Sequence, residues 1–263
     1  MSDLGEKKYF PQNHACLLSA VSERDASCYA TLPNQATSRY RFWLVSAHCN
    51  RMATAVRTKA DLILIQELRE EKEKDSTRSH PSFRFIRGEE GVPAKCWVAV
   101  NRASRCQVTE LKDLTRGWAN YAQALEVKPP GGPSIVIVNI YDRGTEGQRL
   151  AQAVQWDNVM RHSRVIVAGD MNAHSLMWNP KARSRRNAAF WENLITEHAL
   201  VVWNSEEATR MGAGASNHSI IDLTLTSRSL ELNWRIAEEE EATGSDHEVI
   251  VFPAMIYIGR MRV

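Results

Sequence analysis

Acidic and amide side chains stand at the ends of apolar segments, where they could do chemistry in water. Glu67 follows the apolar run LILIQ, and Asp170 and Asn172 follow VIVAG. Gly169 permits a tight turn, and a carboxylate and an amide two residues apart can face the same way in extended backbone. Glu67 is therefore either an exposed strand end or a carboxylate that binds a hard cation. Asp170 and Asn172 form either a plain Asx turn or the core of a site.

A second set of polar residues follows later in the chain. Asp222 interrupts the apolar segment SIIDLTLT, where a buried carboxylate needs a specific partner such as a histidine. Asp246 and His247 directly precede the apolar EVIVF. They form either a loop ion pair or a site whose imidazole titrates near neutral pH. For Asp222, a purely structural hydrogen bond stays an equal alternative.

The elements that must position these residues are mostly strands. Helices are predicted over residues 144–162 and around Trp191 to His198, where apolar residues recur at helical spacing. Runs of strands with few long helices favour an α/β (α+β) fold in which two mostly antiparallel sheets pack together and helices cover them outside. The predicted strands are FWLVSA, LILIQ, FRFI, CWVAVN, CQVTEL, YAQALEV, SIVIVNIY, RVIVAGD, ALVVW, SIIDLTLT, LNWRIA and EVIVF.

Composition excludes several classes of protein. With 263 residues, 43% of them hydrophobic and 24% charged, the chain has the balance of a globular domain. A net charge of +2 is too small to argue for nucleic-acid binding by the whole molecule. Five cysteines without CxxC pairing argue against a disulfide framework and a zinc site. We expect an intracellular protein, nuclear or cytoplasmic, that is neither secreted nor inserted in a membrane.

The start of the chain differs from the rest. Residues 1–38 lack sustained periodicity and hold polar residues and scattered charge. No Gly/Ser-rich or Pro-rich linker divides the remaining residues. The sequence therefore predicts an N-terminal extension over residues 1–38 and one domain over residues 39–263.

The order of the motifs resembles that of the endonuclease/exonuclease/phosphatase superfamily. The resemblance covers about residues 41–255 and is greatest to the apurinic-like endonuclease domain of LINE-type (non-LTR) retrotransposons. It implies a deoxyribonuclease I-like four-layer sandwich and metal-dependent hydrolysis of a phosphodiester. The matching segments are LILIQE, STRSHPSF, IVNIY, GDMNAHSLMWNP, SIIDLTLTS and GSDHEVI.

The resemblance also implies a metal centre. A divalent ion, usually Mg²⁺ with Mn²⁺ as an alternative, would be held on Glu67 with help from Asp246. The ion would neutralise the phosphate and the charge that develops on the leaving oxygen. Asp170 would position or deprotonate the attacking water, and the Asn172 amide would hydrogen-bond the phosphate.

The remaining matches concern the phosphate and the leaving group. By the resemblance, His247 would contact the scissile phosphate, Asp222 would orient His247, and Tyr141 would assist at the leaving side. Substrate contacts are assigned to His48, Asn139, His174, Trp178 and Ser219. The implied product is DNA nicked in one strand with a 3′ hydroxyl.

The sequence departs from the family pattern at three positions. His48 stands where the family has an asparagine, Leu68 replaces a proline, and Asn179 replaces a glycine. An imidazole can replace one hydrogen bond of an amide, but it changes the reach and adds a titrating group. A catalytically impaired protein that keeps the fold and DNA binding is therefore one alternative, and a lipid or inositol phosphatase of the same superfamily is another.

A basic loop follows the GDMNAHSLMW segment and is a candidate DNA contact. Trp178 could stack or wedge beside this loop. The alternative is a solvated basic loop with Trp178 in the core. The cationic residues of the loop are Lys181, Arg183, Arg185 and Arg186.

Overall fold

The computed structural model describes residues 38–42, 44–48, 60–67, 80–87, 95–115, 121–143, 154–182, 186–212, 218–237 and 245–258. All of them belong to one compact unit, Thr37–Val263. Residues 1–37 of the predicted extension, and also Leu68, Arg183 and Arg185, lie outside the described residues. The boundary at residue 38 stays a prediction.

One six-stranded sheet carries most of the residues discussed above. Its strand order is β10-β11-β9-β8-β7-β6, and β8 and β9 are parallel while the other neighbours are antiparallel. Every residue of β8 and β9 is buried, as continuous apolar runs such as IVIV and VIVA predict. The strands are β6 (Gln107–Glu110), β7 (Ala122–Lys128), β8 (Ile135–Tyr141), β9 (Val165–Asp170), β10 (Val201–Val202) and β11 (Asp222–Thr226).

A second six-stranded sheet has the order β13-β14-β2-β3-β5-β4. Here β2 and β3 are parallel and the other pairs are antiparallel, so the predicted antiparallel majority is confirmed. The strands are β2 (Leu44–His48), β3 (Leu62–Gln66), β4 (Phe83–Ile86), β5 (Trp97–Asn101), β13 (Arg235–Ile236) and β14 (Ile250–Val251).

A smaller sheet of three strands has the order β1-β15-β12. It consists of β1 (Ser38–Phe42), β15 (Ala254–Ile258) and β12 (Glu231–Leu232). The predicted strand LNWRIA is thus divided, because β12 pairs with β15 while β13 pairs with β14. Strand β15 was not predicted. Pro253, which lacks a backbone N–H, separates it from β14.

The two six-stranded sheets pack face to face. Alternate residues of β3 enter different cores: Leu62 and Leu64 pack between the sheets, while Ile63 and Ile65 pack on the other face. The same holds for β8, whose Ile137 lies between the sheets and whose Val138 faces the helices. The predicted two-sheet sandwich is therefore confirmed.

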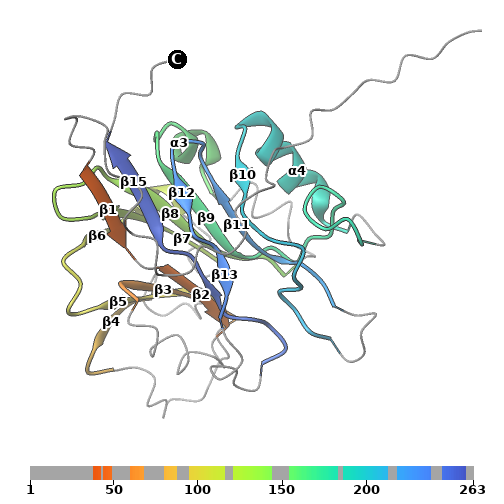
Figure 1. Cartoon of the computed structure of the whole chain (residues 1–263), viewed down its shortest axis with the longest axis horizontal. Coiled ribbons are helices and arrows are strands. Elements are labelled where there is room, and N and C mark those ends of the chain that lie inside the picture. The colour runs from red at the N-terminus through yellow and green to blue at the C-terminus, as the bar shows by residue number, and fades with distance from the viewer. Residues whose placement is uncertain are drawn as a thin grey trace, which may run out of the picture. The chain divides into compact units, whose positions relative to one another are not determined.

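Two helices lie along the outer face of the first sheet (Figure 1). Helix α3 (Trp156–Met160) covers the end of the predicted helix 144–162, whose residues 144–153 lie outside the described residues. Helix α4 (Ala188–Glu197) agrees with the predicted second helix, and His198 is its C-cap. Trp191 is fully buried, and its ring meets those of Trp156 and Phe190 edge-on. A short 3-10 helix, η3 (Lys112–Thr115), precedes β7.

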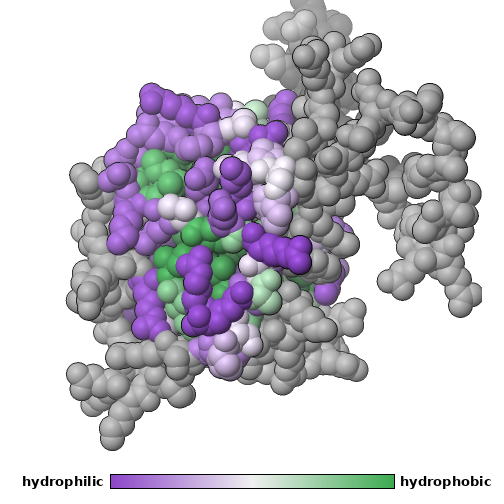
Figure 2. Space-filling model, turned by 90° about the vertical axis from the view of Figure 1, so that its left-hand side faces the viewer, coloured by the Kyte–Doolittle hydropathy of each residue, from purple (hydrophilic) through white to green (hydrophobic). Residues whose placement is uncertain are grey.

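On the face in Figure 2, hydrophilic side chains surround smaller apolar areas among the described residues. None of the described helices combines the length and the hydropathy that crossing a membrane requires.

Candidate active site

The ends of three neighbouring strands bring polar residues to one edge of the first sheet. Tyr141 ends β8, Asp170 ends β9, and Asp222 begins β11. In the sheet register, Asp170 pairs with Tyr141 on one side and with Asp222 on the other. Because β8 and β9 are parallel and β11 is antiparallel to β9, all three residues lie at the same edge.

Asp170 is held by the turn that follows it. The backbone N–H of Asn172 donates to Asp170 Oδ1 and its amide Nδ2 donates to Asp170 Oδ2, both at 2.9 Å. The same Nδ2 donates to the carbonyl oxygen of Asp142 at 2.7 Å. Asn172 has a φ of 43°, a left-handed conformation that asparagine tolerates better than most residues. The predicted turn and the predicted site are thus one structure, since the turn aims the carboxylate.

Asp222 and His247 form a buried dyad. Nδ1 of His247 lies 2.9 Å and 3.1 Å from the two carboxylate oxygens of Asp222. His247 is 5% exposed and Asp222 is 3% exposed, so water competes little for this contact. Thr209 Oγ1 accepts hydrogen bonds from the backbone N–H groups of Ile221 and Asp222, both at 3.0 Å, which fixes the start of β11.

The side chain of Asp170 lies close to the Asp222–His247 dyad. Donor atoms of Asp170, Asp222 and His247 all lie within 4.8 Å of one another, and all three residues are buried. This is the group of described residues that could surround a cation. It differs from the predicted ligand set, Glu67 with Asp246, in each member.

Glu67 reaches the site from the second sheet through Tyr141. A hydrogen bond joins the two side chains, and burial, followed by the charges of Glu67 and Asp170, raises the pKa of Tyr141 well above its usual value. The Tyr121 ring stacks on Tyr141 with centroids 6.3 Å apart. Glu67 has a φ of 52°, which turns the chain sharply at the end of β3.

A buried amide cluster connects the two sheets directly beneath Glu67. Gln66 Nε2 donates to Asn139 Oδ1 at 2.7 Å, and Ser46 Oγ donates to Gln66 Oε1 at 3.2 Å. Asn139 Nδ2 donates to the carbonyl oxygens of Ile65 (3.3 Å) and Trp97 (3.0 Å). Gln66 and Asn139 are 0% exposed. The Asn139 amide is therefore enclosed and joins the sheets, and the predicted substrate contact by Asn139 stays a prediction.

Asp246 lies at the rim of the site. Its Oδ2 accepts a hydrogen bond from Arg210 Nε at 2.9 Å, and both side chains are close to half exposed. Partial burial acts to raise the pKa of Asp246, but the Arg210 hydrogen bond and the charges of His247 and Arg210 outweigh it and lower the pKa. A cation bound to Asp246 would share this carboxylate with Arg210.

The other predicted substrate contacts occupy different environments. His174 is half-buried, and burial and the nearby charges of Arg186 and Arg210 lower its pKa. Ser219 is 8% exposed and its backbone pairs with Arg210. Trp178 is 5% exposed and belongs to the core beneath α4, which favours the core alternative over DNA stacking. The side chain of His48 lies outside the described residues.

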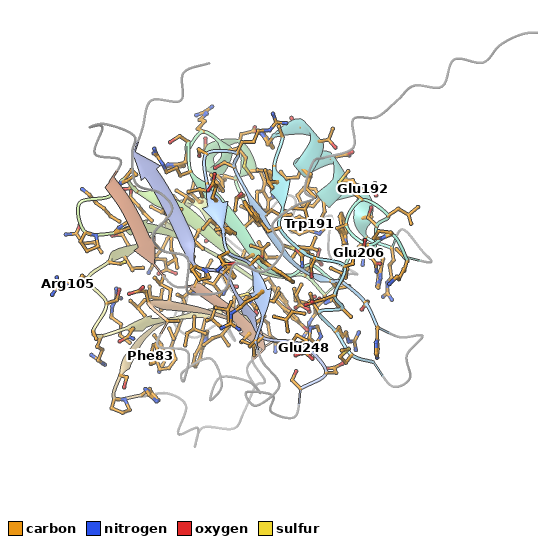
Figure 3. The ribbon with its side chains drawn as sticks, viewed as in Figure 1. Phe83, Arg105, Trp191, Glu192, Glu206 and Glu248 are labelled. Carbon is orange, nitrogen blue, oxygen red and sulfur yellow. The ribbon has the colours of Figure 1, made fainter. Side chains whose placement is uncertain are left out.

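Hydrogen bonds hold His174 and Ser175 in the segment that follows Asp170. Ser175 Oγ donates a short hydrogen bond to Glu192, which is labelled on α4 in Figure 3. The backbone N–H of His174 donates to the carbonyl oxygen of Arg186 at 2.8 Å. Leu176 and Met177, which follow Ser175, are large apolar residues with exposed fractions of 61% and 48%.

The chain is similar to a known protein family and to several solved structures. Residues 135–251 match the family model described as endonuclease-reverse transcriptase. The endonuclease domain of TRAS1, a telomere-specific non-LTR retrotransposon, superposes with a TM-score of 0.63 at 20% identity, over 81% of this chain and 97% of that chain. An endonuclease/exonuclease/phosphatase from Beutenbergia cavernae superposes with a TM-score of 0.54 at 13% identity, over 82% of this chain and 72% of that one. The chain has the fold of the endonuclease/exonuclease/phosphatase superfamily.

A further solved structure shares this fold. The catalytic domain of APE2 from Xenopus laevis superposes with a TM-score of 0.59 at 14% identity, over 84% of this chain and 94% of that chain. No curated protein sequence matches the chain. The resemblance read from the order of motifs is confirmed, and these identities establish the fold rather than the reaction.

Sequence reasoning missed four residues at the site. Gln66, Asp142, Thr209 and Arg210 lie beside predicted site residues in space. Gln66 and Asp142 are direct chain neighbours of Glu67 and Tyr141, and a polar residue inside an apolar strand is a usable signal. Thr209 and Arg210 stand in the segment ATRMG, which has no apolar periodicity. The sequence pattern therefore does not indicate that Thr209 and Arg210 lie at the site.

Proposed function

We propose that the chain is a divalent-metal-dependent endonuclease that nicks one strand of DNA and leaves a 3′ hydroxyl. The observation that supports this function most is the convergence of Asp170 with the Asp222–His247 dyad within 4.8 Å, beside the Glu67–Tyr141 pair. Buried carboxylates, an imidazole and a phenol at one sheet edge provide groups that can orient water, move a proton and contact phosphate.

The donor set suits a hard divalent cation. Carboxylate oxygens of Glu67 and Asp170, with Asp246 at the rim, are the ligand type that Mg²⁺ and Mn²⁺ prefer. When bound, such an ion supplies positive charge that offsets the phosphate and the developing charge on the leaving oxygen. The hydrogen bond between Asp222 and His247 Nδ1 makes these two residues better suited to proton chemistry than to holding the ion.

Asp170 is the residue best placed to orient the attacking water. Two hydrogen bonds from Asn172 hold both of its carboxylate oxygens in place, so it is preorganised before substrate arrives. It can accept a proton from a water molecule, and the Asn172 side chain limits its rotation. The predicted contact between Asn172 and phosphate stays a prediction, because Asn172 Nδ2 is already used by Asp170 and Asp142.

His247 is the residue best placed to contact the phosphate. Asp222 holds its Nδ1, which fixes the orientation of the ring and places Nε2 on the side away from Asp222. The buried Asp222 carboxylate keeps the ring oriented, and an imidazole nitrogen so placed can contact a phosphate oxygen. Tyr141, whose hydroxyl is held by Glu67, stays protonated at neutral pH and can donate a hydrogen bond at the leaving side.

Supercoiled plasmid tests this function directly. We expect nicked circles in the presence of Mg²⁺ or Mn²⁺ and none with EDTA. Asp170→Asn and His247→Ala should each abolish nicking, whereas Asp157→Asn and His162→Ala, exposed positions on or after α3, should nick like the native chain. The absence of metal-dependent nicking by the native chain would refute the proposal.

The same assay separates the alternatives. Phosphate release from phosphoinositides without DNA nicking would support the lipid or inositol phosphatase. DNA binding without any hydrolysis would support the catalytically impaired protein. In that case His48→Asn, which restores the asparagine of the family pattern, should recover nicking if His48 is the cause.

A further inference from the structure

The backbone of Arg210 is pinned between two segments of the site. Its N–H donates to the carbonyl oxygen of Ser219 at 2.9 Å, and Ser219 N–H donates back at 3.0 Å. On the other side, Arg210 bridges to His247, and the N–H of Met211 donates to the carbonyl oxygen of Asp246. Arg210 is therefore carried by the same rigid frame as the Asp222–His247 dyad.

The guanidinium is only partly used by the protein. Its Nε donates to Asp246, and no bond from the two terminal nitrogens is seen among the described residues. The side chain is 42% exposed. The charge lies close enough to Asp170 and Asp222 to interact with both, and it also acts on His174. The protein thus holds Arg210 at Nε, and the described residues make no seen bond to its terminal nitrogens. The side chain lies beside Asp170 and Asp222.

Folding does not account for this arrangement. An exposed ion pair adds little to stability, since water screens it and two long side chains lose freedom. The site, in contrast, has a need for positive charge: Glu67, Asp170, Asp222 and Asp246 all repel a phosphodiester. A guanidinium held by a carboxylate through Nε keeps its planar fork directed and can still bind a phosphate through its terminal nitrogens.

We propose that Arg210 is a substrate ligand that binds a DNA phosphate at the active site, and that Asp246 positions it through Nε. This inference rests on the proposed function. Asp246 then acts on the substrate through Arg210 whether or not it also touches the metal ion.

Binding measured without metal tests this role apart from catalysis. Fluorescence anisotropy with a short labelled DNA duplex in EDTA should show Arg210→Ala binding about 10- to 100-fold more weakly than the native chain, as expected for a lost charged hydrogen bond. The slope of log K against log[salt] should fall by about 0.9, the change for one phosphate contact. Arg210→Lys should keep most of the slope but lose affinity, because an ammonium lacks the fork.

Arg228→Ala is the matched control. Arg228 is also exposed and also makes one Nε bond, to the carbonyl oxygen of Ala199 at 3.3 Å, but it follows the end of β11 opposite to Asp222. This variant should bind DNA like the native chain. If the native chain nicks DNA but Arg210→Ala has unchanged DNA affinity and an unchanged salt slope, the inference is overturned and the proposed function is not. A native chain that neither binds nor nicks DNA would overturn the proposed function as well.

Discussion

At the scale of single residues, the dyad of Asp222 and His247 has a well-defined geometry. Both side chains are buried, and the imidazole is oriented by a bidentate contact. A carboxylate in this place sets the tautomer and the orientation of the ring. Asp222→Asn should therefore lower the nicking rate by about 10²-fold or more while the protein stays folded. Single-turnover nicking and circular dichroism would check this, and an unchanged rate would remove Asp222 from the mechanism.

His174 gives a pH dependence to stability. Burial and the charges of Arg186 and Arg210 lower its pKa in the folded state, so the unfolded chain takes up the proton at higher pH than the folded chain does. Acid therefore favours unfolding through this residue, and the penalty disappears as pH rises above the ordinary histidine range. We expect His174→Gln to lose less stability than the native chain between about pH 7 and about pH 5. Urea unfolding at several pH values measures this, with His162→Gln as the exposed control; parallel curves for native chain and His174→Gln would contradict it.

The residue types in the sequence predicted which residues gather at the candidate site better than they predicted what each residue contacts. Asp170, Asp222 and His247 could be chosen from sequence because a charged residue inside or just after an apolar run must have a partner. Asn139 fits the same rule, yet its partners are Gln66 and two carbonyl groups of the other sheet. Sequence spacing along one strand does not reveal what lies across a sheet interface. For the same reason, the pairing of Asp246 with Arg210 was not predictable.

At the scale of elements, strands β8 and β9 approach each other closely at Gly169. Its φ is 141°, and a Cβ there would lie 2.0 Å from the carbonyl oxygen of Ile140 on the neighbouring strand β8. Gly169→Ala should therefore destabilise the fold by about 3 kcal/mol or more. Gly131→Ala, at an exposed turn with a φ of 69°, should cost only about 1 kcal/mol because it adds strain without a clash. Equal losses in guanidinium unfolding would show that the contact with Ile140 is relieved cheaply.

The amide cluster beneath Glu67 holds the two sheets in register. Asn139→Ala would leave Gln66 Nε2 and the carbonyl oxygens of Ile65 and Trp97 with fewer partners inside the core. We expect a loss of about 2–4 kcal/mol in the free energy of unfolding. Asn158→Ala, on the surface of α3, should change it by less than about 0.5 kcal/mol. A loss no larger than that of the control would mean that water replaces the amide.

Elements were predicted well where one physical rule dominated. Continuous apolar runs predicted buried strands at β3, β8 and β9, and apolar residues at helical spacing predicted α4. Strands β12 and β13 were not separated, because the chain changes sheets within LNWRIA and side-chain pattern carries no information on which neighbour a strand will pair with. Strand β15 was missed because Pro253 indicates that β14 ends but gives no sign that another strand begins after it.

At the scale of the whole molecule, the site draws on both sheets, so a ligand bound there stabilises the entire fold. Glu67 comes from the second sheet, and Tyr141 and Asp170 come from the first. A cation that binds only the folded chain must raise the melting temperature. We expect Mn²⁺ or Mg²⁺ to raise the Tm of the native chain and to leave that of Glu67→Gln unchanged. Calorimetry with Glu231→Gln, on β12 of the small sheet, is the control, and an equal rise in Glu67→Gln would exclude Glu67 as a ligand.

The small sheet has a consequence for how the protein is made. Strand β1 pairs with β15, although the two strands come from opposite ends of the described chain. A ribosome synthesises β1 early and β15 late, so β1 waits without its neighbour while the intervening strands emerge. During that interval the backbone groups of SRYRF are open to other chains. Newly made protein is thus most prone to aggregate before β15 is complete, and a chaperone that covers β1 would protect it for that period.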